Sequence, residues 1–268
     1  KTIEESKKEY KKFLKKFPKF IKNDKKNLYV IANHKKNLID YEIYKQILKS
    51  NKLSFKEEKN DFNLKNFKGI ISCKEKLIDV DTAKKFFLKK LKTNLFTNYK
   101  VNFFKEEKNK IIINNQSFDN LINCTWQTYF PNKGLNFTYE ACLFFLYRSK
   151  MKDHPAITIM DGPFSTLYPQ KKNLFTLYSV KHTRLKNFKN FNDCENFLIN
   201  YKKNINFKLV KKYHEDQIMY FYPDFHKNFK FQKKLLTYRT IINNANAERS
   251  SKIFRNGKII NLLSGKID

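Results

Sequence analysis

The segment Ile157–His182 constrains the fold more than any other part of this sequence. It reads as two extended runs, Ile157–Pro169 and Leu174–His182, separated by a Gln-Lys-Lys-Asn turn. The first run contains Asp161-Gly162-Pro163-Phe164, although the whole chain has five Gly and six Pro residues. Rare residue types retained at a turn indicate that the turn needs their backbone geometry. We therefore expect paired strands here, with a turn of the kind that carries function.

Composition explains why Gly and Pro are rare. Lys (51 residues), Asn, Ile, Phe and Tyr are abundant, whereas Arg (five residues), Gly and Pro are scarce, which is typical of an AT-rich genome. Under that bias Lys becomes the default solvent-facing residue, so the net charge of +31 indicates surface rather than a polyanionic partner. Arg, the better residue for bidentate phosphate and base contacts, is nearly absent. We therefore expect no specific nucleic-acid partner.

The cysteines and the apolar runs bear on metal sites and on location. The four cysteines are widely spaced and contain no Cys-x-x-Cys pair, which indicates neither a zinc site nor a disulfide framework. We expect free thiols in a cytoplasmic protein. No apolar run approaches the roughly 20 residues that cross a bilayer, and the charged first ten residues are unlike a signal peptide.

Hydrophobic periodicity predicts both helices and strands. Apolar residues recur at steps of three and four in the predicted helices 1–17, 41–48, 80–91 and 193–203. Aromatic and β-branched runs predict strands at 28–32, 69–73, 101–104, 110–114, 120–124, 137–148, 156–160, 174–180 and 258–263. We expect 110–114 and 120–124 to form a hairpin, and Asp81 or Thr82 to cap the third helix. This order indicates an α/β nucleotide-binding layer interrupted by a β-rich substrate layer.

Four segments together resemble a known family. They are Lys1–Phe17, Ile71–Leu91 (with Glu75, Ile78 and Asp79 before its helix), Leu121-Ile122-Asn123-Cys124-Thr125-Trp126, and Gly257–Ile267, which contains Gly265-Lys266-Ile267 before Asp268. In this order and spacing they resemble FAD-dependent oxidoreductases of the D-amino-acid-oxidase (glycine oxidase-like) superfamily. The resemblance covers nearly the whole chain and implies FAD as the cofactor and a small-molecule substrate.

The resemblance also implies an architecture. The expected fold class is α/β (mixed α+β), with a partial FAD/NAD(P)-binding α/β layer interleaved with an antiparallel β-rich substrate domain. Residues 1–65 would be a helical connecting segment and 66–125 part of the FAD-binding domain. Residues 126–240 would form the β-rich substrate domain, and 241–268 would return to the FAD-binding domain.

Candidate site residues follow from the resemblance and from chemistry. The resemblance implies FAD contacts at Val101, Cys124, Thr125, Gly265, Lys266 and Ile267. Tyr178 and His182, four apart near the end of a strand, are expected on one face of it as catalytic residues, although either could be structural. Oxidation of amino acids requires a group that binds a carboxylate, and Arg148, Arg184, Arg239 and Arg249 are candidates. Arg148 and Arg249 are favoured because they flank apolar strands, and Phe164 either faces the substrate or packs in the core. The histidines 34, 154, 214 and 226 are expected at the surface or in turns.

One departure from the family is large. Such enzymes carry a Gly-x-Gly-x-x-Gly segment that binds the pyrophosphate at a helix N-terminus, and the five glycines here cannot supply that spacing. Either the chain, which begins with Lys, lacks roughly the first βαβ unit, or it is a degenerate homologue. Two alternative functions therefore stay open. One is a basic, aromatic-rich protein that binds single-stranded nucleic acid, and the other is an inactive flavoenzyme homologue.

Overall fold

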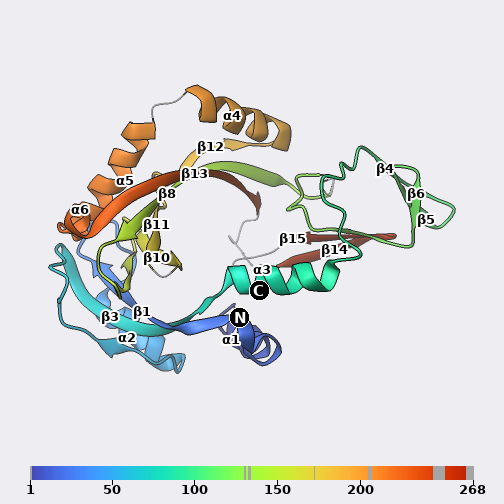
Figure 1. Ribbon diagram of the computed structural model, residues 1–268. Coiled ribbons are helices and arrows are strands. Elements are labelled where there is room, and N and C mark those ends of the chain that lie inside the picture. The colour runs from blue at the N-terminus through green and yellow to red at the C-terminus, as the bar shows by residue number, and fades with distance from the viewer. Residues whose placement is uncertain are drawn as a thin grey trace. The chain divides into compact units, whose positions relative to one another are not determined.

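The computed structural model describes residues 2–129, 131, 134–171, 173–204, 207–243 and 251–263 (Figure 1). The chain divides into two compact units. Unit 1 combines residues 1–22, 78–138 and 240–268, and unit 2 combines 23–77 and 139–239. Helices and strands of both units confirm the predicted mixed α/β fold class. None of the helices in the described part of the chain is long and apolar enough to span a membrane.

A mixed sheet is the frame of unit 2. Nine strands within the described residues form it, in the order β12-β8-β11-β10-β9-β1-β3-β2, with β13 also paired to β8. Strands β1 and β9 pair in parallel, and β9, β10 and β11 form an antiparallel meander that continues to β8. The strands are β1 (Ile21–Ala32), β2 (Lys56–Glu57), β3 (Phe67–Ile78), β8 (Phe137–Ser149), β9 (Ala156–Met160), β10 (Ser165–Lys171), β11 (Leu174–Ser179), β12 (Arg184–Phe188) and β13 (Phe229–Ile242).

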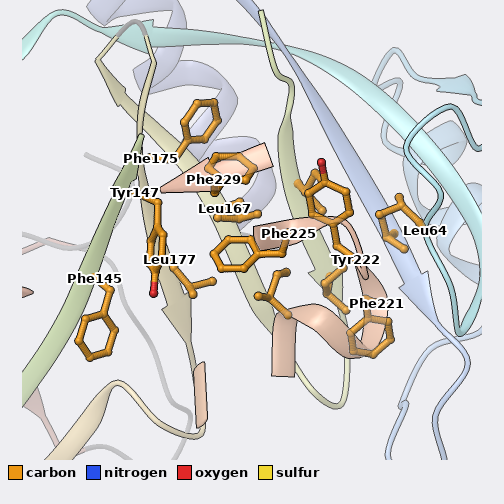
Figure 2. Packing of buried hydrophobic residues seen from close by; sticks show 14 of the residues in the cluster. Leu64, Phe145, Tyr147, Leu167, Phe175, Leu177, Phe221, Tyr222, Phe225 and Phe229 are labelled. Atoms are coloured by element: carbon orange, nitrogen blue, oxygen red, sulfur yellow. The ribbon is translucent and has the colours of Figure 1, made fainter. Parts of the chain in front are cut away.

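The core of unit 2 lies on one face of this sheet, under α4 (Phe191–Asn204), α5 (Phe207–Phe221) and α6 (Phe225–Asn228). Leu143, Phe145 and Tyr147 alternate along β8 and enter this core, as the period of two in a strand requires. Figure 2 shows Phe225 between Tyr147 and Tyr222, and its ring centroid is 4.9 Å from that of Tyr147. The cluster is rich in large aromatic rings, which bury much apolar surface and so stabilise unit 2.

The opposite face of the sheet is covered in part by α2 (Tyr41–Ser50). Asp40 caps this helix by accepting a hydrogen bond from the Glu42 amide. The ring of Tyr44 lies 6.4 Å from that of Tyr29 on β1. Tyr41 lies directly over Gly69 on β3, where any Cβ atom would come within 2.6 Å of its ring. A glycine in this strand therefore allows the helix to approach the sheet closely.

The turn at Asp161–Phe164 joins β9 to β10, so the first predicted run of the Ile157–His182 segment is two strands. Asp161 and Gly162 both adopt left-handed backbone conformations, with φ of 61° and 49°. The Asp161 carboxylate accepts hydrogen bonds from the amides of Leu38 and, at 2.8 Å, Ile39. A Cβ atom on Gly162 would lie 2.8 Å from Asn37 Oδ1. The turn therefore requires glycine because it packs against the loop that follows β1.

Unit 1 contains helices and two small sheets. A three-stranded sheet has the order β14-β15-β7, with β7 and β15 parallel, and a second has the order β4-β5-β6. The aromatic rings of α1, α3 and the 3-10 turn Pro18–Phe20 pack together, with 5.2 Å between Phe20 and Phe86. The elements are α1 (Thr2–Lys16), α3 (Val80–Leu91), β4 (Phe104–Glu107), β5 (Lys110–Ile113), β6 (Gln116–Phe118), β7 (Leu121–Asn123), β14 (Lys252–Asn256) and β15 (Ile259–Leu263).

Three local predictions for unit 1 are wrong. The third helix is capped by Asp79, whose side chain accepts from the Thr82 amide, rather than by Asp81 or Thr82. The strand predicted at 101–104 begins at Phe104. The segment 110–114 forms a hairpin with 116–118, not with 120–124, because β7 leaves it to pair in parallel with β15.

Candidate functional site

The sheet face of unit 2 that lies opposite the core carries a cluster of aromatic rings. Phe144 on β8 lies between the core residues Leu143 and Phe145, so its side chain projects from the face opposite the core. The ring of Tyr178 on β11 stacks on Phe144 at 5.7 Å, and Phe164 meets Tyr178 edge-on at 6.3 Å. Phe144, Phe164 and Tyr178 are called the aromatic cluster below. The structure thus brings together two predicted site residues, Phe164 and Tyr178.

Hydroxyl groups continue the same face across the sheet. Tyr178 is paired in register with Thr166 on β10, Thr166 with Thr158 on β9, and Thr158 with Tyr29 on β1. Their neighbours along each strand, such as Leu177 and Leu167, belong to the core, so this row lies on the face of the aromatic cluster. A face that combines rings with hydroxyls can pack hydrocarbon and also orient polar groups, as small-molecule sites do.

A buried carboxylate on this face joins two arginines. Glu140 on β8 is 4% exposed and accepts from Arg184 Nη1 at 3.2 Å and from Arg239 Nε. Burial disfavours the charge of Arg239, but the hydrogen bond and charge of Glu140 outweigh that effect and raise the Arg239 pKa. Glu140 and Phe144 are four residues apart on β8, so both side chains project from the same face of the sheet, and the Arg239 guanidinium that binds Glu140 lies on that side. One carboxylate between two guanidiniums leaves net positive charge, as an anion site requires.

Of the two arginines favoured from the sequence, the structure describes Arg148, which is not a partner of Glu140. Arg148 is exposed, at the end of β8. Arg249 lies outside the described residues. Of the four candidates, Arg184 and Arg239 meet at Glu140, and Arg239, with a side chain 31% exposed, is the better placed to bind a ligand. Sequence reasoning missed Glu140 and Phe144, although a single acidic residue in the apolar strand Phe137–Tyr147 was a signal for the first.

Tyr178 and His182 do not share a strand face, contrary to the prediction. Strand β11 ends at Ser179, and His182 lies in the turn that follows. Its ring stacks on Tyr213 of α5 at 5.4 Å and lies 5.9 Å from that of His214. Desolvation, together with the charge of Lys181, lowers the pKa of His182. His182 therefore contacts helix α5, whereas Tyr178 belongs to the aromatic cluster.

His154 and His214 were expected at the surface or in turns, and this is wrong for both, since His154 lies in the chain just before β9 and His214 within α5. Both are fully buried. His154 bonds the Pro155 carbonyl and, through Nε2, the hydroxyl of Tyr222 at 2.9 Å. His214 Nδ1 lies 2.9 Å from the Val210 carbonyl and Nε2 lies 3.0 Å from Thr183 Oγ1. These contacts fix a neutral tautomer of His214 that donates from Nδ1 and accepts at Nε2.

We expect the stability of unit 2 to fall in mild acid because of His214. Burial lowers its pKa to about 4, against about 6.5 in the unfolded chain. Above pH 6.5 the residue is neutral in both states, and between pH 6.5 and 4 the unfolded state binds a proton that the folded state does not. The free energy of unfolding should therefore drop by about 3 kcal/mol over this window.

Urea unfolding at half-unit pH steps, for the native protein and a His214→Gln variant, measures this difference. The difference between the two curves isolates His214 from the carboxylates, which titrate in both proteins. Parallel curves between pH 6.5 and 4 would show that His214 is not held neutral.

The second candidate region is the loop after β7 in unit 1. The carboxyl ends of the parallel strands β7 and β15 lie at one edge of their sheet, where ligands of α/β proteins bind. Asn123 is buried at that edge and donates to Asn261 Oδ1 on β15 and to the Tyr129 carbonyl, both at 2.9 Å. Its own Oδ1 accepts from the Thr125 amide and hydroxyl. Asn123 thereby ties the loop to both strands.

This loop exposes the residues that the resemblance assigned to FAD. Cys124, Thr125 and Trp126 are exposed, and Trp126 and Gln127 adopt left-handed backbone conformations with φ of 55° and 59°. Successive amides in turns can form concave anion-binding surfaces, so this loop is the candidate for the predicted contacts with the cofactor. Val101 is half-buried in irregular chain before β4. Gly265, Lys266 and Ile267, which follow β15, lie outside the described residues.

Comparison with known proteins agrees with this architecture. No protein-family model matches the chain. It is 29% identical over 259 residues to the FAD-dependent monooxygenase FPY4 of Fusarium mangiferae, which covers 96% of this chain and 69% of that protein. The sequence similarity therefore extends over both units.

Solved structures share the fold at low sequence identity. NikD, an unusual amino acid oxidase essential for nikkomycin biosynthesis, matches with a TM-score of 0.71 at 9% identity, over 98% of this chain and 74% of that one. Glycine oxidase from Bacillus cereus gives 0.66 at 10% identity (98% and 75%), and L-proline dehydrogenase from P. horikoshii gives 0.62 at 11% (98% and 73%). The predicted likeness to FAD-dependent oxidoreductases is confirmed in sequence by FPY4, and the likeness to amino acid and glycine oxidases is confirmed in fold.

Proposed function

We propose that this protein is an FAD-dependent oxidoreductase that oxidises a C–N or C–O bond of a small, amine- or amino-acid-like molecule bearing a carboxylate. The observation that carries the substrate class is the sheet face of unit 2, where the Glu140 carboxylate that binds Arg239 projects from the same side of β8 as Phe144 of the aromatic cluster. The similarity to FPY4 over 96% of the chain supports the reaction class.

The chain would divide the work between its two units. The loop Asn123–Tyr129 would bind FAD through exposed backbone and the side chains of Cys124 and Thr125, with Gly265–Ile267 as predicted further contacts. When bound, FAD supplies the acceptor for the hydride or electrons that leave the substrate. Arg239 would bind the substrate carboxylate with its remaining N–H groups, and the aromatic cluster would pack its hydrocarbon part and exclude water. The hydroxyl of Tyr178 would orient the polar group of the substrate.

Purification of the full-length protein tests the cofactor. We expect the absorption spectrum of oxidised flavin in the purified protein, and binding of FAD after its removal. A protein that stays colourless and binds no FAD would support the inactive homologue. Salt-sensitive binding of a single-stranded oligonucleotide, with quenching of aromatic fluorescence, would support the nucleic-acid-binding alternative.

Arg239→Gln tests the carboxylate site. Benzoate, which has both a ring and a carboxylate, is a minimal probe of this face, and its binding is followed by the change it causes in the flavin spectrum. We expect Arg239→Gln to weaken benzoate binding by about 10- to 100-fold, because charge-assisted hydrogen bonds contribute about 1.5–3 kcal/mol. The same substitution should change the affinity for benzamide little, because benzamide has no charge.

Arg148→Gln is the matched comparison, since it makes the same chemical change at the arginine favoured from the sequence. We expect it to leave benzoate affinity unchanged because Arg148 is exposed at the end of its strand. The opposite pattern, with the loss at Arg148 and none at Arg239, would assign the carboxylate to Arg148.

A further inference from the structure

One side chain of helix α5, Gln217, bonds two turns of unit 2 at once. Its Oε1 accepts a hydrogen bond from the hydroxyl of Ser179 at 2.7 Å. Its Nε2 donates to the carbonyl oxygens of Pro163 at 2.9 Å and Phe164 at 3.3 Å. A carbonyl can only accept, so the two carbonyls require the NH₂ group of the Gln217 amide, and the Ser179 hydroxyl donates to its oxygen. The partners therefore fix which way round the amide lies.

The two turns are those that place the aromatic cluster. Phe164 is itself a partner of Gln217, and Tyr178 precedes Ser179 directly. The turns are also joined to each other, because the Val180 amide donates to the Phe164 carbonyl at 3.1 Å and Ser165 Oγ donates to the Tyr178 carbonyl at 2.9 Å. Gln217 therefore connects the helix layer on the core side to the backbone of Phe164 and, through the hydroxyl of Ser179, to the residue that follows Tyr178.

We propose that Gln217 is a positioning residue that sets the place of Phe164 and Tyr178 and, through them, the fit of the ring of a ligand. It does not reach the opposite face itself. The role in ligand binding rests on the proposed function, whereas the role in positioning the two turns does not.

The chemistry of the side chain makes the proposal specific. Methionine has a similar shape but can neither donate to the carbonyls nor accept strongly from Ser179. Glutamate keeps an acceptor for Ser179 but places negative charge beside two carbonyl oxygens. Gln217→Glu should therefore displace the Asp161–Phe164 turn more than the turn at Ser179, and Ser179→Ala should do the reverse.

Hydrogen exchange measured by mass spectrometry tests the positioning without flavin or ligand. We expect Gln217→Met to speed exchange at least about tenfold in peptides that cover 161–166 and 178–183, as loss of ~1.4 kcal/mol of local stability would. Exchange in 156–160 and 144–148 should not change. Tyr147→Phe is the matched control: it removes the buried 2.8 Å bond from Tyr147 to Glu215, also on α5 but on the core side of the sheet.

Probe binding tests the consequence for the site. We expect Gln217→Met to weaken benzoate and benzamide by the same factor, about tenfold, because the ring contacts change while Arg239 does not. Tyr147→Phe should leave the affinities for benzoate and benzamide unchanged. Its thermal unfolding midpoint should be similar to that of Gln217→Met, so that the two variants are compared at similar stability. Faster exchange with unchanged affinities in Gln217→Met would overturn the role in ligand binding.

The two proposals fail in distinguishable ways. If the native protein binds neither FAD nor benzoate, the proposed function fails, and the exchange experiment still decides whether Gln217 positions the turns. Unchanged exchange in 161–166 and 178–183 would overturn the positioning role whether or not flavin binds.

Discussion

Replacement of Glu140 by alanine is expected to lower the free energy of unfolding of unit 2 by about 3 to 5 kcal/mol, the range for removal of one partner of a buried ion pair. The carboxylate is 4% exposed and is shared by Arg184 and Arg239, so its loss leaves two guanidiniums without a counter-charge. Because Arg184 remains 53% exposed and solvated, we expect a value in the lower part of this range. The main cost falls on the half-buried Arg239.

Urea unfolding followed by circular dichroism measures this change. The double variant Glu140→Ala/Arg239→Gln should regain part of the stability, because both charges are then absent. Benzoate binding should also weaken in Glu140→Ala, because Arg239 loses the bond that orients it. A loss below 1 kcal/mol, or no coupling between the two substitutions, would show that the pair does not organise this face.

Replacement of Phe225 by alanine is expected to cost a similar amount, about 3–5 kcal/mol, through a cavity in the core. Phe225 is fully buried, and its ring lies 4.9 Å from that of Tyr147 and 5.4 Å from that of Phe229 (Figure 2). Neighbouring aromatic rings collapse poorly into the space that a missing ring leaves, so little of the loss is recovered.

Leu209→Ala is the comparison for this prediction. Leu209 also belongs to the helical layer, on α5, but is 53% exposed, and we expect a change within about 0.5 kcal/mol. The urea midpoints of the two variants measure the contrast. Equal losses would mean that the core under α5 and α6 does not dominate the stability of unit 2.

Hydrophobic periodicity predicted correctly those elements whose apolar residues follow a regular helical or strand pattern along their whole length. The strand 156–160 and the helix 80–91 have the predicted bounds. Helix α5 was missed because its inner side carries the buried polar residues His214 and Glu215, which interrupt the apolar pattern. Strand β13 was missed because most of its residues are half-buried or exposed. In both cases tertiary contacts, rather than local pattern, decide the structure.

The candidate site could be predicted where its residues are neighbours along the chain. Phe164 and Tyr178 belong to one segment, and the pairing of β10 with β11 brings them together. Arg239 and Glu140 are 99 positions apart, and nothing in either sequence neighbourhood indicates their contact. The hairpin predicted for 120–124 failed for the same reason, since the partner of β7 lies far along the chain in β15.

The parallel pairing of β7 with β15 has a consequence for biosynthesis. Unit 1 is assembled from three separate stretches of chain, and the two stretches of unit 2 lie between them in the sequence. While the ribosome is still translating unit 2, Asn123 has no Asn261 to bond, and the loop that follows β7 lacks its contact with β15. Since long-range pairing is slow and leaves strand edges open to wrong partners, nascent chains that await β15 are the stage most prone to aggregation. All residues of the core of unit 2 precede β15 in the sequence, so a released chain that ends ahead of β15 should still hold a folded unit 2, whereas unit 1 would lack a strand.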